Sequence, residues 1–180
     1  MTHKSFFISL LCASALLISS CGGNSSGGSK SSGTIHSTGL FSVQIPEGWE
    51  VSPFYHMGTE DVDLKTVAVH KGTALEFQVM LCPTLQIQYY PEGKHYVAQS
   101  KSNYQQAEDM EPLTLGKNTW NGFSCMTSKY GGEYNIPLYW FMTDMDGNKF
   151  AIAYWPELGE EKTSLNDADV KAIISSITLD

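Results

Sequence analysis

Short runs of alternating apolar and polar residues, separated by turn residues, fill most of the chain after residue 38. Alternation with a period of two is typical of strands that bury one face, and short runs between turns pair readily as hairpins. The turn Asp-Met-Asp-Gly at 144–147 contains Asp-Gly, a frequent tight-hairpin sequence. The pattern therefore predicts a mainly antiparallel sheet. Its strands are expected at 40–45, 49–51, 65–70, 74–82, 113–116, 119–130, 136–143 and 148–155.

Two further segments have the spacing of helices. Near the end of the chain, four apolar residues lie at positions i, i+3, i+4 and i+7 of one helical face. They are Val170, Ile173, Ile174 and Ile177. Ser164 and Asp167 precede this helix with the spacing of a capping box. The segment 92–107 contains no proline and has little strand character, so we expect a second helix there. Helices of this kind must cover at least one face of the sheet.

The domain expected from these elements covers residues 39–180, a length of 142 residues without a second linker or an internal repeat. Its opening run at 41–49, FSVQIPEGW, resembles the start of PsbP-like proteins, which include the photosystem protein PsbP, the Mog-type Ran-binding proteins and the DcrB-like lipoproteins. The closing run at 170–179, VKAIISSITL, is similar to their usual C-terminus. The resemblance implies an α+β fold, an α-β-α sandwich around an antiparallel sheet, in a protein that binds or assembles rather than catalyses. It brings no functional residue to this sequence.

The first 20 residues have the form of a bacterial signal peptide. Lys4 precedes an apolar stretch at 6–18, which is shorter than the roughly 20 residues that span a bilayer but suits a signal sequence. The stretch ends in Leu-Ile-Ser-Ser-Cys at 17–21, which resembles the lipobox of bacterial lipoproteins. The resemblance implies cleavage between Ser20 and Cys21, a diacylglycerol thioether on Cys21 and an acylated new N-terminus. The expected partner of this end of the chain is therefore the membrane, through covalent lipid.

The residues after Cys21 predict a flexible linker. The segment 21–38 is rich in glycine and serine, a composition with little to bury and a high entropic cost of ordering. Glycine at position 22, in place of the aspartate that retains lipoproteins in the inner membrane, favours the outer membrane. No acidic run follows Cys21, so we expect the domain to face the periplasm.

The charge of the chain excludes several classes of partner. All 11 basic residues are lysine, against 19 acidic residues, and the net charge is −8. A nucleic-acid binder needs a basic stripe, and bidentate recognition of phosphate generally uses arginine. We therefore expect no nucleic-acid partner. A protein or peptide of the envelope, polar, neutral or cationic, is the better match.

No pattern in the sequence predicts a catalytic residue, a metal ligand or a cofactor. The glycine-rich loops and nucleophile motifs of common enzymes are absent, and the acidic groups at 61–63 and 144–148 lack the full spacing of a calcium loop. The histidines beyond the signal have no ligand spacing. They are His36, His56, His70 and His95. We expect a non-enzymatic binding or assembly module. The alternatives are an envelope hydrolase acting on glycan or peptide through carboxylates that meet only in the fold, and a carrier of a small ligand or lipid.

Two cysteines stay in the expected domain, Cys82 and Cys125. In an oxidising compartment such a pair can form a disulfide. The other possibility is two buried thiols that behave as small apolar side chains. The sequence leaves both open.

Aromatic residues gather in the last third of the chain. The consecutive residues Tyr139, Trp140 and Phe141 must point to alternating faces of a strand. With Trp155, they are the candidate binding surface for a peptide, glycan or lipid, because tyrosine and tryptophan dominate recognition surfaces. The alternative is that helices cover both faces of the sheet and all the rings are core. Trp49, beside the Pro-Glu-Gly turn, is expected to anchor the first hairpin.

Overall fold

Antiparallel strands in two sheets make up most of the described chain. The computed structural model describes residues 33–52, 66–78, 82–129, 134–156 and 167–180. The expectations for the signal peptide, for cleavage and lipidation at Ser20 and Cys21, and for the linker before residue 33 concern residues outside these ranges.

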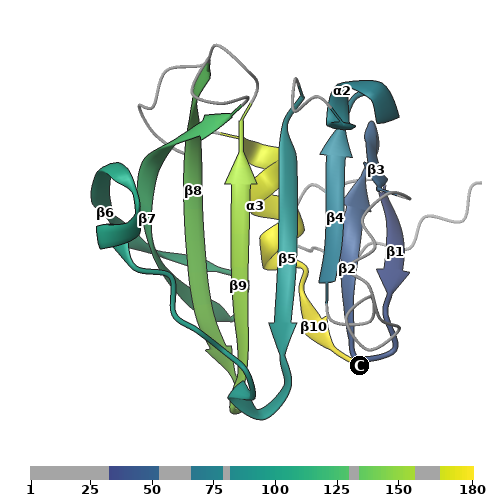
Figure 1. Cartoon of the computed structure of the whole chain (residues 1–180). Helices are drawn as coiled ribbons and strands as arrows, with labels where there is room; N and C mark the ends of the chain where they lie inside the picture. The colour runs from purple at the N-terminus through teal and green to yellow at the C-terminus, as the bar shows by residue number, and fades with distance from the viewer. Residues whose placement is uncertain (1–32, 53–65, 79–81, 130–133, 157–166) are drawn as a thin grey trace, which may run out of the picture. The chain divides into compact units, whose positions relative to one another are not determined.

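The larger sheet has seven strands in the order β3-β4-β5-β9-β8-β7-β6, and every neighbouring pair is antiparallel (Figure 1). The strands are β3 (Trp49–Val51), β4 (Thr66–Lys71), β5 (Thr84–Tyr90), β6 (Gln105–Leu115), β7 (Asn118–Lys129), β8 (Tyr134–Met145) and β9 (Asn148–Trp155). Successive hairpins join β6 through β9, as the alternating pattern predicts. The mainly antiparallel sheet and the α+β class are confirmed.

The hairpin between β8 and β9 has the predicted tight turn. Asp146 and Gly147 both have a positive φ, 52° and 83°, as the central residues of a type I′ turn require. The Gly147 N–H donates to Asp144 Oδ1 at 2.8 Å. Since Met145 pairs with Asn148, this turn determines which side chains of β8 and β9 lie opposite each other.

A smaller sheet and one helix cover one face of the larger sheet. The smaller sheet contains β1 (Gly33–Ser37), β2 (Phe41–Pro46) and β10 (Thr178–Leu179), in the order β1-β2-β10. The helix α3 (Ala168–Ser175), yellow in Figure 1, lies behind β5 and β9. Its buried residues Val170, Ile173 and Ile174 belong to the predicted stripe, so this helix is confirmed.

The start of α3 differs from the predicted capping box. Asp167 is itself the N-cap, and its carboxylate accepts hydrogen bonds from the N–H groups of Asp169 and Val170 at 2.9 and 3.2 Å. A capping box with Ser164 would place Asp167 three residues inside the helix, and Ser164 lies outside the described residues. One acidic side chain next to the first turn is enough to satisfy two of its open N–H groups.

We call the covered side of the larger sheet the core face. Its rings pack closely: Phe41 of β2 meets Phe150 edge-on with centroids 5.5 Å apart and Tyr89 at 5.7 Å. Burying a large apolar side chain stabilises a fold by roughly 1.5–3 kcal/mol, so this cluster holds both sheets and α3 together. Its members are Phe41, Val43, Ile45, Trp49, Val67, Val69, Leu85, Ile87, Tyr89, Trp120, Tyr139, Phe141, Met145, Phe150, Ile152, Tyr154, Val170, Ile173, Ile174 and Ile177.

The opposite side, which carries Tyr90, Trp140 and Trp155, we call the aromatic face. A second apolar cluster lies here, separated from the first by the sheet itself. Its buried members are Phe123, Cys125, Leu138, Trp140, Ala151 and Ala153. Part of its cover comes from the 91–104 segment between β5 and β6, which supplies Tyr96 and Tyr104.

Part of the segment that was expected to be a linker is a strand. Residues 33–37, assigned to the linker from their composition, form β1 and pair with β2 from Gly33–Pro46 to Ser37–Ser42. His36 therefore lies in a strand. Residues 33–37 have little intrinsic preference for a strand, but pairing with the apolar strand β2 stabilises them in one.

The strand expected at 74–82 is wrong. Residues Ala74–Gln78 form the short helix α2, and the chain pairs with β4 only after Pro83, through β5. The physical reason is a capping box that the alternating pattern obscured. The Glu76 carboxylate accepts from the Thr73 N–H at 2.6 Å, and Thr73 Oγ1 accepts from the Glu76 N–H at 3.2 Å.

The helix expected at 92–107 is also wrong. The chain enters the left-handed region at Glu92, Gly93 and His95, with φ between 52° and 67°, which interrupts any helix. Two short 3-10 turns, η1 (Pro91–Gly93) and η2 (Lys101–Asn103), lie in this segment, and β6 begins at Gln105.

Candidate functional site

The four residues predicted as an aromatic surface divide between the two faces of the sheet. Tyr139 and Phe141 are buried on the core face, where Tyr139 stacks on Tyr154 with centroids 5.9 Å apart. Trp140 and Trp155 lie on the aromatic face. The alternation of consecutive rings is therefore confirmed, but the four residues do not form one surface.

Three tyrosines join the two tryptophans on the aromatic face, and none of them belongs to the predicted surface. Tyr90 ends β5, and its ring meets Tyr96 edge-on at 5.3 Å. Tyr104 lies against Phe123 at 5.7 Å and Trp140 at 6.3 Å. Tyr96 and Tyr104 lie in the segment that was expected to be a helix. A helix there does not predict on which face of the sheet these two rings lie.

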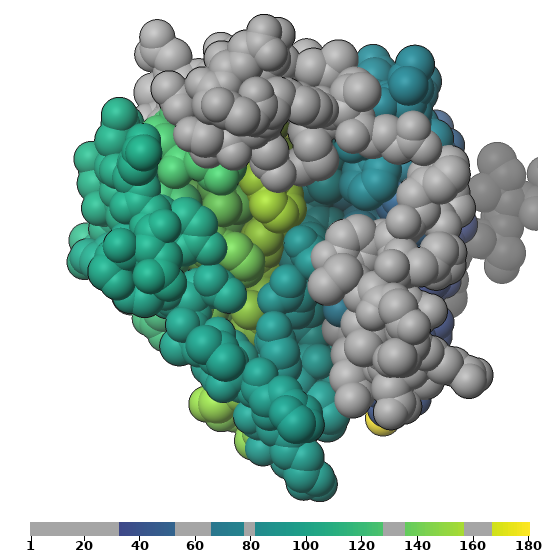
Figure 2. All heavy atoms as spheres, in the orientation of Figure 1, coloured from purple at the N-terminus to yellow at the C-terminus, as the bar shows by residue number. Residues whose placement is uncertain are grey.

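Side chains on β5, β9 and β8 form cross-strand rows on this face. Gln86 pairs with Ala153, and Ala153 pairs with Trp140. One step along, Gln88 pairs with Ala151, and Ala151 pairs with Met142. Each row thus runs from an amide through a methyl group to a large apolar side chain. Figure 2 shows this side hollowed over β9 and β5, with the teal 91–104 segment rising along one side.

Aromatic residues close both ends of these rows. Beyond Gln86 lies the pair Thr84–Trp155, and beyond Gln88 lies the pair Tyr90–Lys149. The two end pairs lie six residue steps apart along β5, which is about 20 Å at the rise of a strand. The rows therefore form a strip of amide, methyl and aromatic groups, which we call the strip: Thr84, Gln86, Gln88, Tyr90, Trp140, Met142, Lys149, Ala151, Ala153 and Trp155.

Hydroxyl and amide groups line the strip and hold one another in place. The Tyr90 hydroxyl donates to Gln88 Oε1 at 2.9 Å, and the Tyr104 hydroxyl donates to Gln99 Oε1 at 3.1 Å. Burial raises the pKa of Tyr90, of Tyr96 and of Tyr104 above the ordinary value of 10. These hydroxyls therefore stay protonated and neutral at physiological pH, as donors.

An ion pair marks the Tyr90 end of the strip. Lys149 Nζ lies 2.6 Å from Asp144 Oδ2 across the β8–β9 hairpin. The hydrogen bond from Lys149 lowers the pKa of Asp144, and the same bond raises the pKa of Lys149. The two charges therefore cancel locally at neutral pH.

The two cysteines, Cys82 and Cys125, are both buried and are not joined to each other. Cys125 lies on β7, whereas Cys82 lies just before β5. Three strand spacings separate these strands, about 14 Å in all, and a disulfide needs Cα atoms within about 7 Å. Cys125 instead donates through Sγ to the Leu138 carbonyl at 3.6 Å. The structure thus has the second of the two arrangements that the sequence left open.

Among the histidines that the structure describes, His70 is the one that is completely buried. Its ring stacks on Phe77 of α2 at 5.0 Å, and neither ring nitrogen has a hydrogen-bond partner. In the part of the chain that the structure describes, no three histidine, cysteine, aspartate or glutamate side chains are grouped so as to hold a metal ion. Among these same residues, no helix is long and apolar enough to cross a membrane.

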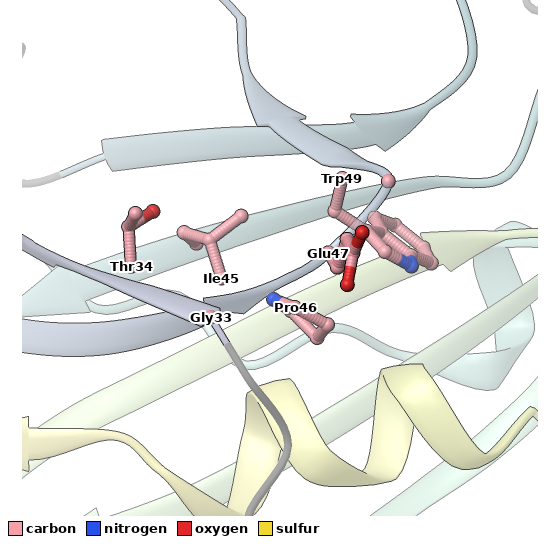
Figure 3. Close-up of a pocket in the computed structure, with 7 residues that line it drawn as sticks. Gly33, Thr34, Ile45, Pro46, Glu47 and Trp49 are labelled. Carbon is pink, nitrogen blue, oxygen red and sulfur yellow. The ribbon is translucent and has the colours of Figure 1, made fainter. Parts of the chain in front are cut away.

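A shallow pocket of about 400 Å³ lies between the start of β1 and the turn that joins β2 to β3 (Figure 3). Its lining residues are Gly33, Thr34, Ile45, Pro46, Glu47, Gly48 and Trp49. The Trp49 indole N–H donates to Asp169 Oδ2 at 3.1 Å, and Lys71 Nζ lies 3.0 Å from the same oxygen. Trp49 therefore ties the first hairpin to the start of α3, the anchoring role expected from the sequence.

No protein-family model and no curated protein matches this sequence. Among solved structures, the fold is similar to a protein of Bacteroides thetaiotaomicron VPI-5482, with a TM-score of 0.50 and 10% identity over 82% of this chain. This chain spans 47% of the length of that protein. LpqN of Mycobacterium tuberculosis, described as involved in cell envelope biogenesis, aligns with a TM-score of 0.44 and 14% identity over 84% of this chain and 87% of its own. The Bacteroides likeness shows the fold alone.

Proposed function

We propose that this protein is a lipid-anchored, non-enzymatic binding module of the bacterial cell envelope, which holds its ligand against the aromatic face. The observation that carries the proposal is the meeting of half-buried rings from distant parts of the chain on one side of the sheet: Tyr90, Tyr96, Tyr104 and Trp155. Rings that are partly exposed beside amides are typical of recognition surfaces. The amide, methyl and aromatic groups of the strip bind ligands but do not transfer protons, which favours binding over hydrolysis.

The proposed anchor is the lipid on Cys21, supported by the signal and lipobox residues. Because β1 begins at Gly33, the linker between the lipid and the domain consists of residues 22–32. Such a segment reaches at most about 40 Å when extended and about 20 Å on average as a flexible coil. The domain then stays close to the membrane, which we propose to be the outer membrane, on its periplasmic side.

The PsbP-like relationship is part of the proposal for the fold. The two runs that carry the resemblance occupy β2 to β3 at the start of the domain and α3 to β10 at its end. In the described chain these elements are neighbours, because β10 pairs with β2. The three-stranded sheet β1-β2-β10 lies with α3 on the core face. The resemblance implies a layer of helices there, so this small sheet is an addition to it.

Photo-crosslinking in living cells tests the binding face. A benzophenone amino acid replaces Gln88 on the strip of the full-length, lipid-anchored protein, and a control carries it at Thr178, an exposed residue of β10. We expect an envelope component to become attached at position 88 and not at 178. Equal attachment at both positions, or none at position 88, would refute the proposed face.

The anchor has its own test. Cys21→Ala should abolish labelling by palmitate and release the protein from the membrane fraction. The variant Cys82→Ala, whose thiol is buried in the domain, is the matched control and should keep both. A Cys21→Ala protein that stays membrane-bound would contradict the lipid anchor.

A further inference from the structure

We propose that the ligand of the aromatic face is a neutral glycan, whose sugar rings stack on Trp155 and Tyr90 and whose hydroxyls pair with Gln88. This inference rests on the proposed binding function and names the chemical class of its ligand.

The order of groups along the strip is the first reason. Trp155 and Tyr90 stand at its two ends, about 20 Å apart along the strands, and the rows Gln86–Ala153–Trp140 and Gln88–Ala151–Met142 lie between them. Gln86, Trp140 and the two alanines are buried and form the floor of the strip, so the half-buried Gln88 and Met142 and the two end rings offer the binding surface. A ring at each end with an accessible amide between them suits a short chain of linked rings.

The chemistry of the side chains is the second reason. The face of an aromatic ring carries partial negative charge, and the C–H bonds on one side of a sugar ring present the complementary positive edge. Each glutamine amide offers two donors and an acceptor, and the Tyr90 and Tyr104 hydroxyls stay protonated. Sugar hydroxyls, which both donate and accept, match this mixture.

An acyl chain matches the mixture of rings, amides and hydroxyls on the strip less well than a glycan does. Hydrocarbon laid along the strip would cover the half-buried amide of Gln88 without offering it a hydrogen-bond partner. Each polar group left unpaired in this way costs about 1–3 kcal/mol. A lipid ligand would instead favour a surface without amides.

Charge is the third reason. In the rows of the strip Lys149 is the cation, and Asp144 neutralises it at 2.6 Å. The whole chain has a net charge of −8 and no arginine, so an anionic polymer would be repelled rather than held. The strip also presents no unpaired carboxylate that would select a cationic peptide. The ligand that its charges fit is neutral.

The composition of the species crosslinked at position 88 tests the inference. After purification and acid hydrolysis, we expect neutral sugars as the attached material. Amino acids or fatty acids in place of sugars would overturn the glycan inference and leave the binding face standing. If nothing is attached at position 88, the proposed function itself fails.

Titration of the mature, lipidated protein in detergent with neutral oligosaccharides gives a second measurement. The probes are tetrasaccharides of glucose and of N-acetylglucosamine, followed by tryptophan fluorescence. We expect saturable binding to at least one of them, weakened about tenfold or more by Trp155→Ala and restored in large part by Trp155→Phe. Gln88→Leu, which keeps the size of the side chain and removes the amide, should weaken it about fivefold.

Thr178→Ala, on the other sheet, is the control and should bind as the unmodified protein does. Circular dichroism confirms that each variant is folded before titration. Failure of every oligosaccharide to bind, or equal binding by Gln88→Leu and the unmodified protein, would overturn the inference.

Discussion

Both faces of the seven-stranded sheet carry large rings, but they are covered in different ways. On the core face a second sheet and α3 exclude water from residues such as Phe150 and Trp120. On the aromatic face the described cover is a segment with two short 3-10 turns, and Tyr90, Tyr96 and Trp155 stay partly exposed. Regular elements bury rings completely, because they satisfy their own backbone groups while they pack. An irregular cover leaves room for a ligand.

The largest expected effect is on the core face. Phe150 is fully buried between Phe41 and Tyr89, so Phe150→Ala leaves a cavity where both sheets meet. We expect a loss of about 3–5 kcal/mol in the free energy of unfolding, measured by chemical denaturation. A loss below about 1 kcal/mol would contradict the difference between the two faces.

The next effect tests the close pairing of β7 and β8. A Cβ atom on Gly122 would lie 2.0 Å from the Trp140 carbonyl oxygen, so Gly122→Ala must push two strands apart. We expect a loss of about 2–3 kcal/mol, again from denaturation curves. Asn121→Ala is the matched control on the same strand, since its side chain is exposed. It should change the free energy of unfolding by less than about 0.5 kcal/mol.

Trp155→Ala compares the aromatic face directly with the core. Because the Trp155 side chain is only partly buried, we expect the free energy of unfolding to fall by about 1–2 kcal/mol, well below the effect of Phe150→Ala. Crosslinking at position 88 should fall much more strongly. A loss of stability equal to that of Phe150→Ala would show that this ring is core rather than binding surface.

The next prediction concerns the N-terminus of α3, the helix that covers part of the core face. Asp167 caps α3 through two hydrogen bonds, so Asp167→Ala should lower the free energy of unfolding by about 1 kcal/mol. Asp167→Ser keeps a hydrogen-bond acceptor at the N-cap and should therefore lose much less of the free energy of unfolding. Equal destabilisation by alanine and serine would rule out the capping role.

The smallest effect is a dependence on pH. Hydrogen bonds from Lys71 and then from Trp49 lower the pKa of Asp169 below its ordinary value of 3.8. A depressed carboxyl pKa stabilises the fold above the pKa of the unfolded chain, and this contribution disappears as the pH falls through the folded pKa. Since Asp169 is 37% exposed, solvent screening limits the effect to about 1 kcal/mol or less.

We therefore expect the unmodified protein to be more stable than Asp169→Asn at pH 6, with the difference shrinking below about pH 4. Thermal unfolding at a series of pH values measures it. A difference that does not change between pH 6 and pH 3 would show that the ionised carboxylate contributes nothing to stability.

Local patterns predicted the elements whose determinants lie within a few residues. The Asp146-Gly147 turn and the stripe of α3 are of this kind, and both are confirmed. The strand expected at 74–82 failed because Thr73 and Glu76 cap a helix through their side chains, a local signal that a search for alternation does not detect. The helix expected at 92–107 failed because the backbone adopts positive φ at residues that do not require it, a choice made by the surrounding structure.

By itself, the sequence determined that rings at 139, 140 and 141 point to opposite faces, since alternation is a property of any extended strand. Only the tertiary structure decided which face is core. Burial depends on what packs against the sheet, and that cover comes from far along the chain: β2 and α3 on one side, Tyr96 and Tyr104 on the other. A ring becomes core or binding surface through these distant contacts, which no local pattern records.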